Sequence, residues 1–440
     1  MTVITPLTPV EEAVYHLEQH TESWNIQIEL AADERLDADR LRDAAEAAGE
    51  HHPMARARLE RHGGLDSELR WRIPDGVEDL RFAASAADDA EELRALRAAF
   101  YDDGYVLTED LPYRVHLVDG PDRDRVMLSV CHVPCDGIGA LRLATSITAA
   151  YRGDPLPEDP VDLATARRAL DDARPDSAGG HLRQLVNAAD HLRNTVDDPD
   201  RIAGTAGADA DGDWGFAHAA LAVPDDLDVG RRPDDVSVND VLLAGFHRAI
   251  ARWNDDHGAP ADKLSLMMPV NLRPPDWFYD VVGNYALFDR VATTAGDRGD
   301  AAATLAAVAR QTRAIKEQDS AVGLLASMDL IPAATPVDLR GRLTDFLRGP
   351  GEGLMDTAVL SNLGRVPEPS PSFGGDGPAD LWFSPPCRGP TAVGLGVATV
   401  GDTLSLSLRY TTGHLDHGAA ERLLALTVEE AERTVAAGDG

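Results

Sequence analysis

Hydrophobic positions along the chain follow two periods, and together they predict a mixed α/β fold. Residues 24–30 alternate apolar with polar side chains, which is the pattern of a half-buried strand. Residues 41–48 carry apolar side chains at helical spacing; Asp37 is a candidate N-cap before them, and the helix should end before Pro53. Further strands are predicted at 126–130, 264–270, 355–360 and 403–410, and further helices at 138–151 and from Ser237 or Asn239 to Trp253.

The chain length predicts two lobes. At 440 residues the chain exceeds what one hydrophobic core normally supports. Residues 154–213 are polar, proline-rich and then acidic, so we interpret them as an inter-lobe connection that is partly helical. The N-terminal lobe is then 1–153 and the C-terminal lobe 214–440. The acidic, alanine-rich stretch 83–100 is expected to be one exposed helix, and the sequence shows no internal repeat.

The net charge of -34 limits the classes of binding partner and indicates the cellular environment of the protein. Lys263 and Lys316 are the only lysines among 41 basic residues, so Arg supplies nearly all positive charge. No basic face is left for nucleic acid. Self-repulsion at this charge weakens as the Debye length falls from about 10 Å at 0.1 M salt to about 3 Å at 1 M. The composition favours the cytoplasm of a salt-loving microbe, and an ordinary acidic cytosolic protein is the alternative.

Targeting signals and cysteines agree with that location. The sequence has no run of eighteen apolar residues and no basic segment followed by an apolar one. We therefore expect no membrane span, no signal peptide and a cytoplasmic protein. Cys131, Cys135 and Cys387 are an odd number in a long chain, so they are expected to be reduced thiols. The sequence leaves the oligomeric state open.

Residues 131–137 place a His and an Asp-Gly pair between a strand pattern and a helical pattern. His132 would lie at the carboxyl end of the strand 126–130, where its imidazole could take a proton from a hydroxyl or amine near neutral pH. Each residue also has a structural interpretation. His132 could be a satisfied core histidine, and Asp136 the N-cap of the next helix, with Gly137 relieving a tight start.

The two cysteines around His132 suggest other chemistries, and both are disfavoured. A Cys-x3-Cys pair around one His lacks the spacing of a closed zinc site and has no partner cluster elsewhere. A thiolate nucleophile would need its His across the fold, whereas neighbouring side chains in one strand point to opposite faces. No metal is predicted.

Ordered blocks along the chain resemble the thioester-dependent acyltransferase superfamily. That superfamily includes chloramphenicol acetyltransferases, condensation domains of nonribosomal peptide synthesis, alcohol acetyltransferases and mycolipid acyltransferases. Besides the His132 motif, the similar blocks are LTPVE (7–11), WNI (24–26), HHPMAR (51–56), VNDVLLA (238–244), PVNLRP (269–274), VGN (282–284) and SNLG (361–364). They follow the family's order and span most of the chain.

Two departures favour one branch of the superfamily. Condensation domains usually carry a second His immediately before the active one, and here that position is Cys131. They also carry an Asp-Phe-Gly-Trp-Gly block, where this chain reads DLWFSPP at 380–386. The resemblance therefore leans towards alcohol and mycolipid acyltransferases.

The resemblance implies a fold and a mechanism. The fold is α/β and two-lobed, like chloramphenicol acetyltransferase, with a mixed β-sheet covered by helices in each lobe and an active-site tunnel between them. His132 would remove the acceptor's proton as it attacks the thioester carbonyl, then return a proton to the leaving thiolate. No cofactor is expected to be bound, because acyl-CoA or acyl-phosphopantetheine is a co-substrate.

Supporting residues are assigned by motif position. Asp136 is expected to turn away from the imidazole and pair with Arg273, bracing the lobes, and Gly137 belongs to the same structural loop. Asn284 and Ser361 are expected to contact the substrate or the oxyanion. For each of these two, a turn or strand-end hydrogen bond is the alternative.

Three classes of function remain open. The first is transfer of an acyl group from a CoA or carrier-protein thioester to an alcohol acceptor, a lipid or small metabolite. The second is amide formation by a free-standing condensation enzyme, and the third is a non-catalytic descendant that binds a hydrophobic ligand or carrier protein. Retention of His132, Asp136, Gly137 and Arg273 together argues against the third. Arg340, Arg342 and Arg348 could receive a donor phosphate, although surface ion pairs are the alternative.

Overall fold

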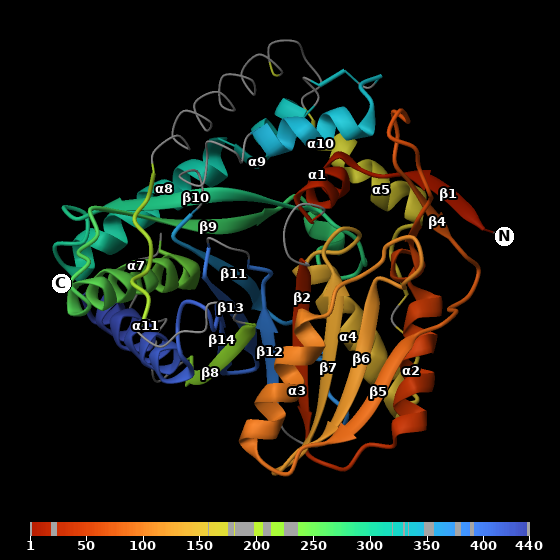
Figure 1. Ribbon diagram of the computed structural model, residues 1–440, viewed down its shortest axis with the longest axis horizontal. Coiled ribbons are helices and arrows are strands. Elements are labelled where there is room, and N and C mark those ends of the chain that lie inside the picture. The colour runs from red at the N-terminus through yellow and green to blue at the C-terminus, as the bar shows by residue number, and fades with distance from the viewer. Residues whose placement is uncertain are drawn as a thin grey trace.

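Two β-sheets with helices packed on them form the two lobes of the molecule (Figure 1). The mixed α/β, two-lobed fold predicted from the sequence is confirmed. The computed structural model describes the whole chain except residues 1, 19–23, 157, 175–179, 181–197, 206–212, 224–235, 319, 329–330, 333, 347–355, 375–379, 388–390 and 438–440.

The sheet of the N-terminal lobe has five strands among the described residues. In spatial order they are β12 (Asp380–Ser384), β2 (Asn25–Ala32), β7 (Asp124–Cys131), β6 (Tyr113–Asp119) and β5 (Arg81–Ala86). All neighbours are antiparallel except β5 and β6, which are parallel. A small sheet beside it contains β1 (Val3–Pro6), β4 (Arg70–Ile73) and β3 (Arg58–Leu59).

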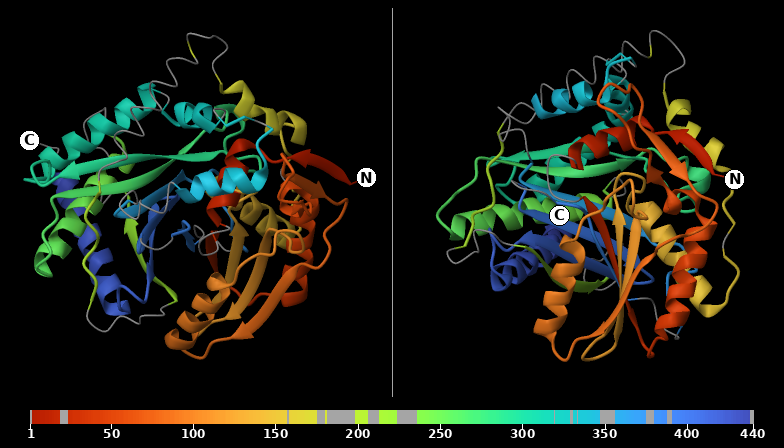
Figure 2. Two further views of the ribbon diagram at one scale, coloured as in Figure 1. Left: turned by 45° about the horizontal axis from the view of Figure 1, so that its top comes forward. Right: turned by 45° about the vertical axis from the view of Figure 1, so that its right-hand side comes forward.

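Helices cover both faces of the five-stranded sheet. Because successive side chains of a strand point to opposite faces, β7 contributes to two cores. Leu128 and Val130 pack in the core shared with α2 (Ala38–His51) and α4 (Gly137–Arg152), whereas Met127 packs with α3 (Ala90–Asp102). Figure 2 shows α2 and α3 on opposite sides of this sheet in its right-hand view.

The sheet of the C-terminal lobe has six described strands. In order they are β10 (Ala286–Thr294), β9 (Lys263–Asn271), β11 (Ala358–Arg365), β13 (Val393–Val400), β14 (Thr403–Thr411) and β8 (Trp214–Ala222). Strand β11 runs parallel to both its neighbours, and the other pairs are antiparallel. Apolar residues of α7 (Val238–Asp256), α8 (Ala301–Gln318) and α11 (His417–Ala437) pack with this sheet in a second core.

The two lobes are joined by more than one passage of chain. Strand β12 lies far along the chain yet pairs with β2, register Phe383 opposite Ile28, so the C-terminal half completes the N-terminal sheet. Helix α1 (Pro9–Glu18) contacts α9 (Ser320–Met328) and α10 (Val337–Phe346), near α5 (Leu163–Asp172) in Figure 1. The predicted division into 1–153, 154–213 and 214–440 stays a prediction.

Most local predictions are confirmed. Asp37 caps α2 by accepting from the Arg40 backbone at 2.8 Å. Ser237, rather than Asn239, caps α7 in a reciprocal capping box with Asp240. Strand β11 begins later than predicted, and residue 355 lies outside the described residues.

The single helix predicted over 83–100 is wrong in its first part. Strand β5 continues to Ala86, and α3 begins only after Asp89, which accepts from the backbones of Glu91 and Glu92. Pairing with β6 satisfies the backbone of 81–86, so tertiary contact overrides the helix propensity of the alanines. No helix in the described part of the chain combines the length and the apolar character needed to span a membrane.

Candidate active site

His132 lies in the turn between β7 and α4. Its backbone N–H donates to the Trp24 carbonyl at 2.9 Å, which extends the pairing of β2 with β7 by one residue. Its ring stacks on the Trp24 ring with centroids 6.0 Å apart. Nδ1 lies 2.9 Å from the Cys135 carbonyl oxygen. Because a carbonyl can only accept, this contact assigns the proton to Nδ1 and leaves Nε2 with a lone pair.

The surroundings of His132 favour the neutral imidazole. Burial lowers the pKa of His132 below its ordinary value, while the hydrogen bond to Cys135 and the charge of Asp136 act in the opposite direction and are outweighed. A neutral ring with one nitrogen fixed as a donor is the form that a general base requires at neutral pH.

A largely apolar cavity lies beside His132. Both lobes contribute to it, through α1, β2 and β12 near the N-terminal sheet and β9, β10 and β11 of the C-terminal sheet. Its apolar lining includes Val14, Leu17, Met267, Leu287, Phe288 and Phe383. Such walls suit an aliphatic chain and offer little to a charged ligand.

Asp136 turns away from the imidazole and accepts hydrogen bonds from four other groups, one of which is the Asn271 side-chain amide at 3.2 Å. It caps α4 by accepting from Gly139 at 2.9 Å, and it accepts from the Tyr285 backbone at 2.9 Å. Arg273 Nη1 lies 2.6 Å from each of its oxygens. The side chains of Asp136 and Arg273 are 1 % and 0 % exposed, so this is a fully buried ion pair between the lobes. Arg273 also donates to the Gly283 carbonyl at 2.8 Å. Asp136 therefore both caps α4 and links the two lobes through its ion pair with Arg273.

The remaining predicted residues separate into two groups. Asn284 Nδ2 donates to the carbonyls of His132 and Val133 at 2.7 and 3.2 Å, so its amide holds the motif turn. Ser361 and Gly137 line the cavity. A Cβ at Gly137 would lie 2.8 Å from a methyl group of Leu363, so a larger residue here would push that side chain aside. Any contact of Asn284 or Ser361 with substrate stays a prediction.

The roles of two residues beside His132, Trp24 and Glu18, were not predicted from the sequence. Trp24 was recognised as part of a strand, but its ring also covers the imidazole. Glu18, at the end of α1, accepts from the Cys131 thiol at 3.8 Å. Burial raises the pKa of Glu18 to about 7, against the lowering effect of hydrogen bonds from Cys131 and the Trp24 backbone. No sequence signal identifies Glu18, because only the fold brings α1 beside β7.

The cysteines and Arg340 follow their structural interpretations. Burial raises the pKa of the Cys131 thiol well above its ordinary value, and that of Cys135 as well, which opposes thiolate formation. Arg340 pairs with Glu12 at 3.0 Å. Arg342 is exposed, and Arg348 lies outside the described residues.

The two lobes and the cavity between them define a fold class, the two-lobed fold of the chloramphenicol acetyltransferase type. Residues 3–164 match the family model of the condensation domain. An uncharacterized protein of Mycobacterium tuberculosis is 31% identical over 417 residues, covering 91% of this chain and 93% of that protein. The chain belongs to the condensation-domain family of the thioester-dependent acyltransferase superfamily.

Two further similarities bear on its chemistry. A second M. tuberculosis protein, provisionally named a diacylglycerol O-acyltransferase, is 39% identical over 85 residues, which cover 19% of this chain and 16% of that protein. Among solved structures, the starter condensation domain of rhizomide synthetase, in complex with C8-CoA, aligns over 99% of this chain and 95% of that chain. Its TM-score is 0.69 at 15% identity, so this likeness concerns the fold.

Proposed function

We propose that the protein transfers an acyl group from a thioester to an alcohol, with His132 as the general base. The observation that carries this proposal is the position of the neutral imidazole at an apolar cavity, with Nδ1 held by the Cys135 carbonyl. Nε2 takes the proton of the acceptor hydroxyl as its oxygen attacks the thioester carbonyl. The tetrahedral intermediate then expels the thiolate, which receives the proton from the imidazolium.

The oxyanion of that intermediate needs a hydrogen-bond donor. Ser361 is the candidate that lines the cavity, whereas the Asn284 amide nitrogen already bonds the backbone of the motif turn. We therefore assign the oxyanion contact to the Ser361 hydroxyl and a positioning role to Asn284. Asp136 and Arg273 act on the motif loop and not on the reacting atoms.

The substrate classes follow from the cavity and the family. The donor is an acyl-CoA or an acyl-phosphopantetheine on a carrier protein, and the acceptor is a lipid or small hydrophobic alcohol. The apolar lining supports an aliphatic acyl group, and a relative's name includes diacylglycerol O-acyltransferase. We place this reaction in a salt-rich cytoplasm, on the grounds of composition. Amide formation is the second candidate, favoured by the family model of the condensation domain.

The test is a matrix of acyl-thioesters of increasing chain length against alcohol and amine acceptors, in about 1 M potassium chloride. Products are identified by mass spectrometry and free thiol is measured in parallel. Ester formation in the wild type that disappears in His132→Ala supports the proposal. Amide products alone would transfer the assignment to the condensation reaction. Tight acyl-thioester binding with no product under any pairing would instead identify a binding protein.

A further inference from the structure

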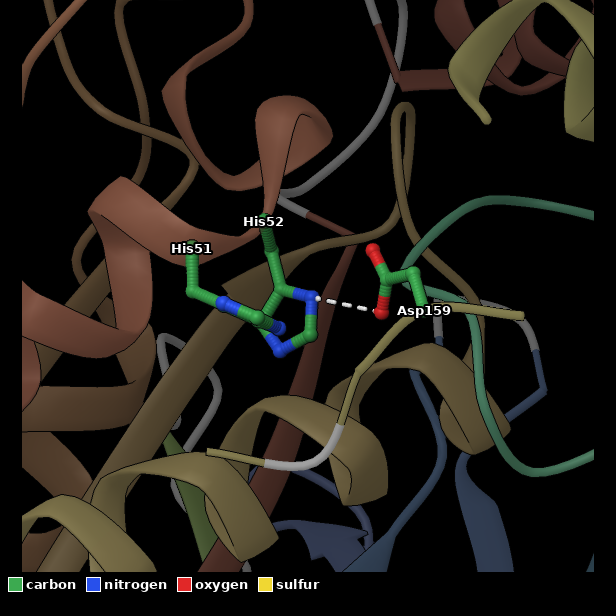
Figure 3. Close-up of side chains that lie close together, drawn as sticks. All are labelled: His51, His52 and Asp159. Carbon is green, nitrogen blue, oxygen red and sulfur yellow. Dashed lines mark ion pairs between the residues drawn. The ribbon is translucent and has the colours of Figure 1, made fainter. Parts of the chain in front are cut away.

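We propose that His51, His52 and Asp159 form a binding site for a divalent transition-metal ion of the zinc class. The site is separate from the proposed acyl transfer, since none of the three residues lines the cavity at His132. One ligand atom from each residue lies within 4.8 Å of the others. Figure 3 shows the Asp159 carboxylate facing the His52 imidazole and the His51 ring edge-on to His52 on its other side, with the histidines and Asp159 on two separate segments.

The two segments are far apart in the chain. His51 is the last residue of α2 and His52 is its C-cap, whereas Asp159 belongs to the segment between α4 and α5. An ion held by all three would fasten the end of α2 to the chain that leaves α4. The ion would therefore stabilise the N-terminal lobe and take no part in chemistry at His132.

His52 is held as a metal ligand usually is. Its side chain is 0 % exposed, and Nε2 lies 2.8 Å from the Ser146 hydroxyl on α4. Nδ1 lies 3.5 Å from Asp159 Oδ1, which is too long for a good hydrogen bond. Among the described residues Nδ1 makes no shorter polar contact than this ion-pair distance to Asp159. A His whose far nitrogen is fixed by an oxygen while the near one faces a carboxylate in this way has the orientation that outer partners give to metal-bound imidazoles.

The ligand set points to the ion. Two imidazoles and one carboxylate bind zinc at about 2.0 to 2.2 Å, which places ligand atoms about 3.3 Å apart in a tetrahedral site. The 3.5 Å between His52 and Asp159 is already close to that spacing. The ring of His51 meets the His52 ring edge-on with centroids 4.8 Å apart. The His51 side chain would therefore have to move further than those of His52 and Asp159 to reach the ion. Calcium and magnesium prefer oxygen ligands, so they fit this set poorly.

Arg142 limits the affinity of this site for a metal ion. Its Nη2 lies 3.4 Å from Asp159 Oδ1, the same oxygen that faces His52. An incoming cation must share the carboxylate with this guanidinium or use the other oxygen. We therefore expect binding weaker than at a closed four-ligand zinc site, with a water completing the coordination.

The experiment uses full-length protein stripped with a chelator and dialysed into metal-free high-salt buffer. Zinc binding is measured by calorimetry and metal content, and cobalt is substituted so that its visible absorption reports the geometry. The wild type should bind one equivalent. His51→Ala and Asp159→Asn should each weaken binding at least about tenfold, the usual effect of altering a metal site.

His257→Ala, on an exposed His at the end of α7, is the matched control and should bind zinc as the wild type does. Circular dichroism on metal-free samples establishes that each variant is folded before titration, and having two independent variants guards against the failure of one. Two results would overturn the site. One is the absence of stoichiometric zinc or cobalt binding to the wild type. The other is binding by His51→Ala and Asp159→Asn equal to that of the wild type, which would place the ion elsewhere.

Discussion

The same strand–turn–helix corner is built twice in this molecule, and only one copy carries a candidate active site. In the first, β7 ends at Cys131 and Asp136 caps α4. In the second, β14 ends at Thr411, and Asp416 accepts from the Ala419 backbone at 2.9 Å at the start of α11. The residue after each strand donates its N–H to the chain just before a neighbouring strand. His132 donates to Trp24 at 2.9 Å, and Thr412 to Asp213 at 2.8 Å.

The two corners differ in what the rest of the protein contributes to them. Asp136 is buried and pairs with Arg273 from the other lobe, whereas Asp416 is exposed. Between strand end and helix start the two segments share only this Asp, which explains why the sequence shows no repeat. A helix cap at a strand end is therefore general architecture. The partner lobe, the cavity and the imidazole distinguish the first corner as a candidate site.

The largest expected difference between the corners is in activity. His132→Ala should reduce acyl transfer by about 10²- to 10⁴-fold, the usual contribution of a general base, and leave the fold intact. Thr412→Ala, at the matched position of the second corner, should transfer acyl groups at the wild-type rate. Rates are measured under single-turnover conditions with circular dichroism as the folding control. A His132→Ala variant as active as the wild type would refute the mechanism.

The next difference is in stability. Asp136→Ala leaves Arg273 buried without its partner, which should cost roughly 3 to 5 kcal/mol of the free energy of unfolding. Asp416→Ala removes only an exposed cap and should cost about 1 kcal/mol. Denaturant titrations in high salt compare the two variants. Equal losses would mean that Asp136 acts only as a cap.

A double-mutant cycle separates the contribution of the Asp136–Arg273 ion pair to stability from the contribution of the helix cap at Asp136. Asp136→Asn and Arg273→Met are measured singly and together for their free energy of unfolding. Contacting residues of this kind should show a coupling of about 1 kcal/mol or more. Additive losses would contradict the 2.6 Å contact between the two side chains.

Glu18 adds a pH dependence near neutrality to the first corner. Its pKa is raised to about 7 by burial, so the folded protein binds a proton that the unfolded chain releases near pH 4.5. Stability from this group is complete below pH 4.5 and is lost as pH rises through about 7. Glu18→Gln should therefore be more stable than the wild type by about 2 to 3 kcal/mol at pH 8, and the gain should vanish at pH 4. Glu432→Gln, on the exposed side of α11, is the control expected to show no such gain. A gain of equal size at both pH values would exclude titration of Glu18 as its cause.

The smallest effect concerns the pH profile of the reaction. Burial lowers the pKa of His132 below its usual 6.5, so the acidic limb of kcat/KM should fall with a midpoint below 6.5. The profile is best recorded in Glu18→Gln, which removes a second group that titrates nearby. A midpoint above 6.5 in that variant would contradict the lowering of the His132 pKa by burial.

The parts of the candidate site that depend on local sequence were predictable. The strand before His132 and the cap at Asp136 lie where the local pattern predicts them. The pairing of Asp136 with Arg273, expected from the family resemblance, is also present. The roles of Trp24 and Glu18 could not be predicted, because they depend on α1 and β2 meeting β7 in space.

The fold was predictable to a similar extent. Apolar periodicity located most strands, since burial on one face of a sheet imposes that period. It failed at 81–86, where pairing with β6 decides the structure, and it gave no sign that β12 would join β2. Both errors concern partners distant in the sequence, about which local patterns carry no information.

The pairing of β12 with β2 also has a consequence for synthesis. Until residues 380–384 leave the ribosome, β2 has an unpaired edge, because its other neighbour among the described strands is β7. At roughly 5 to 20 residues per second, that edge stays open for on the order of tens of seconds after β7 is made. An open edge is a template for pairing with other chains. The acidic charge that repels neighbouring nascent chains would protect the protein most during this interval, before it has any activity to perform.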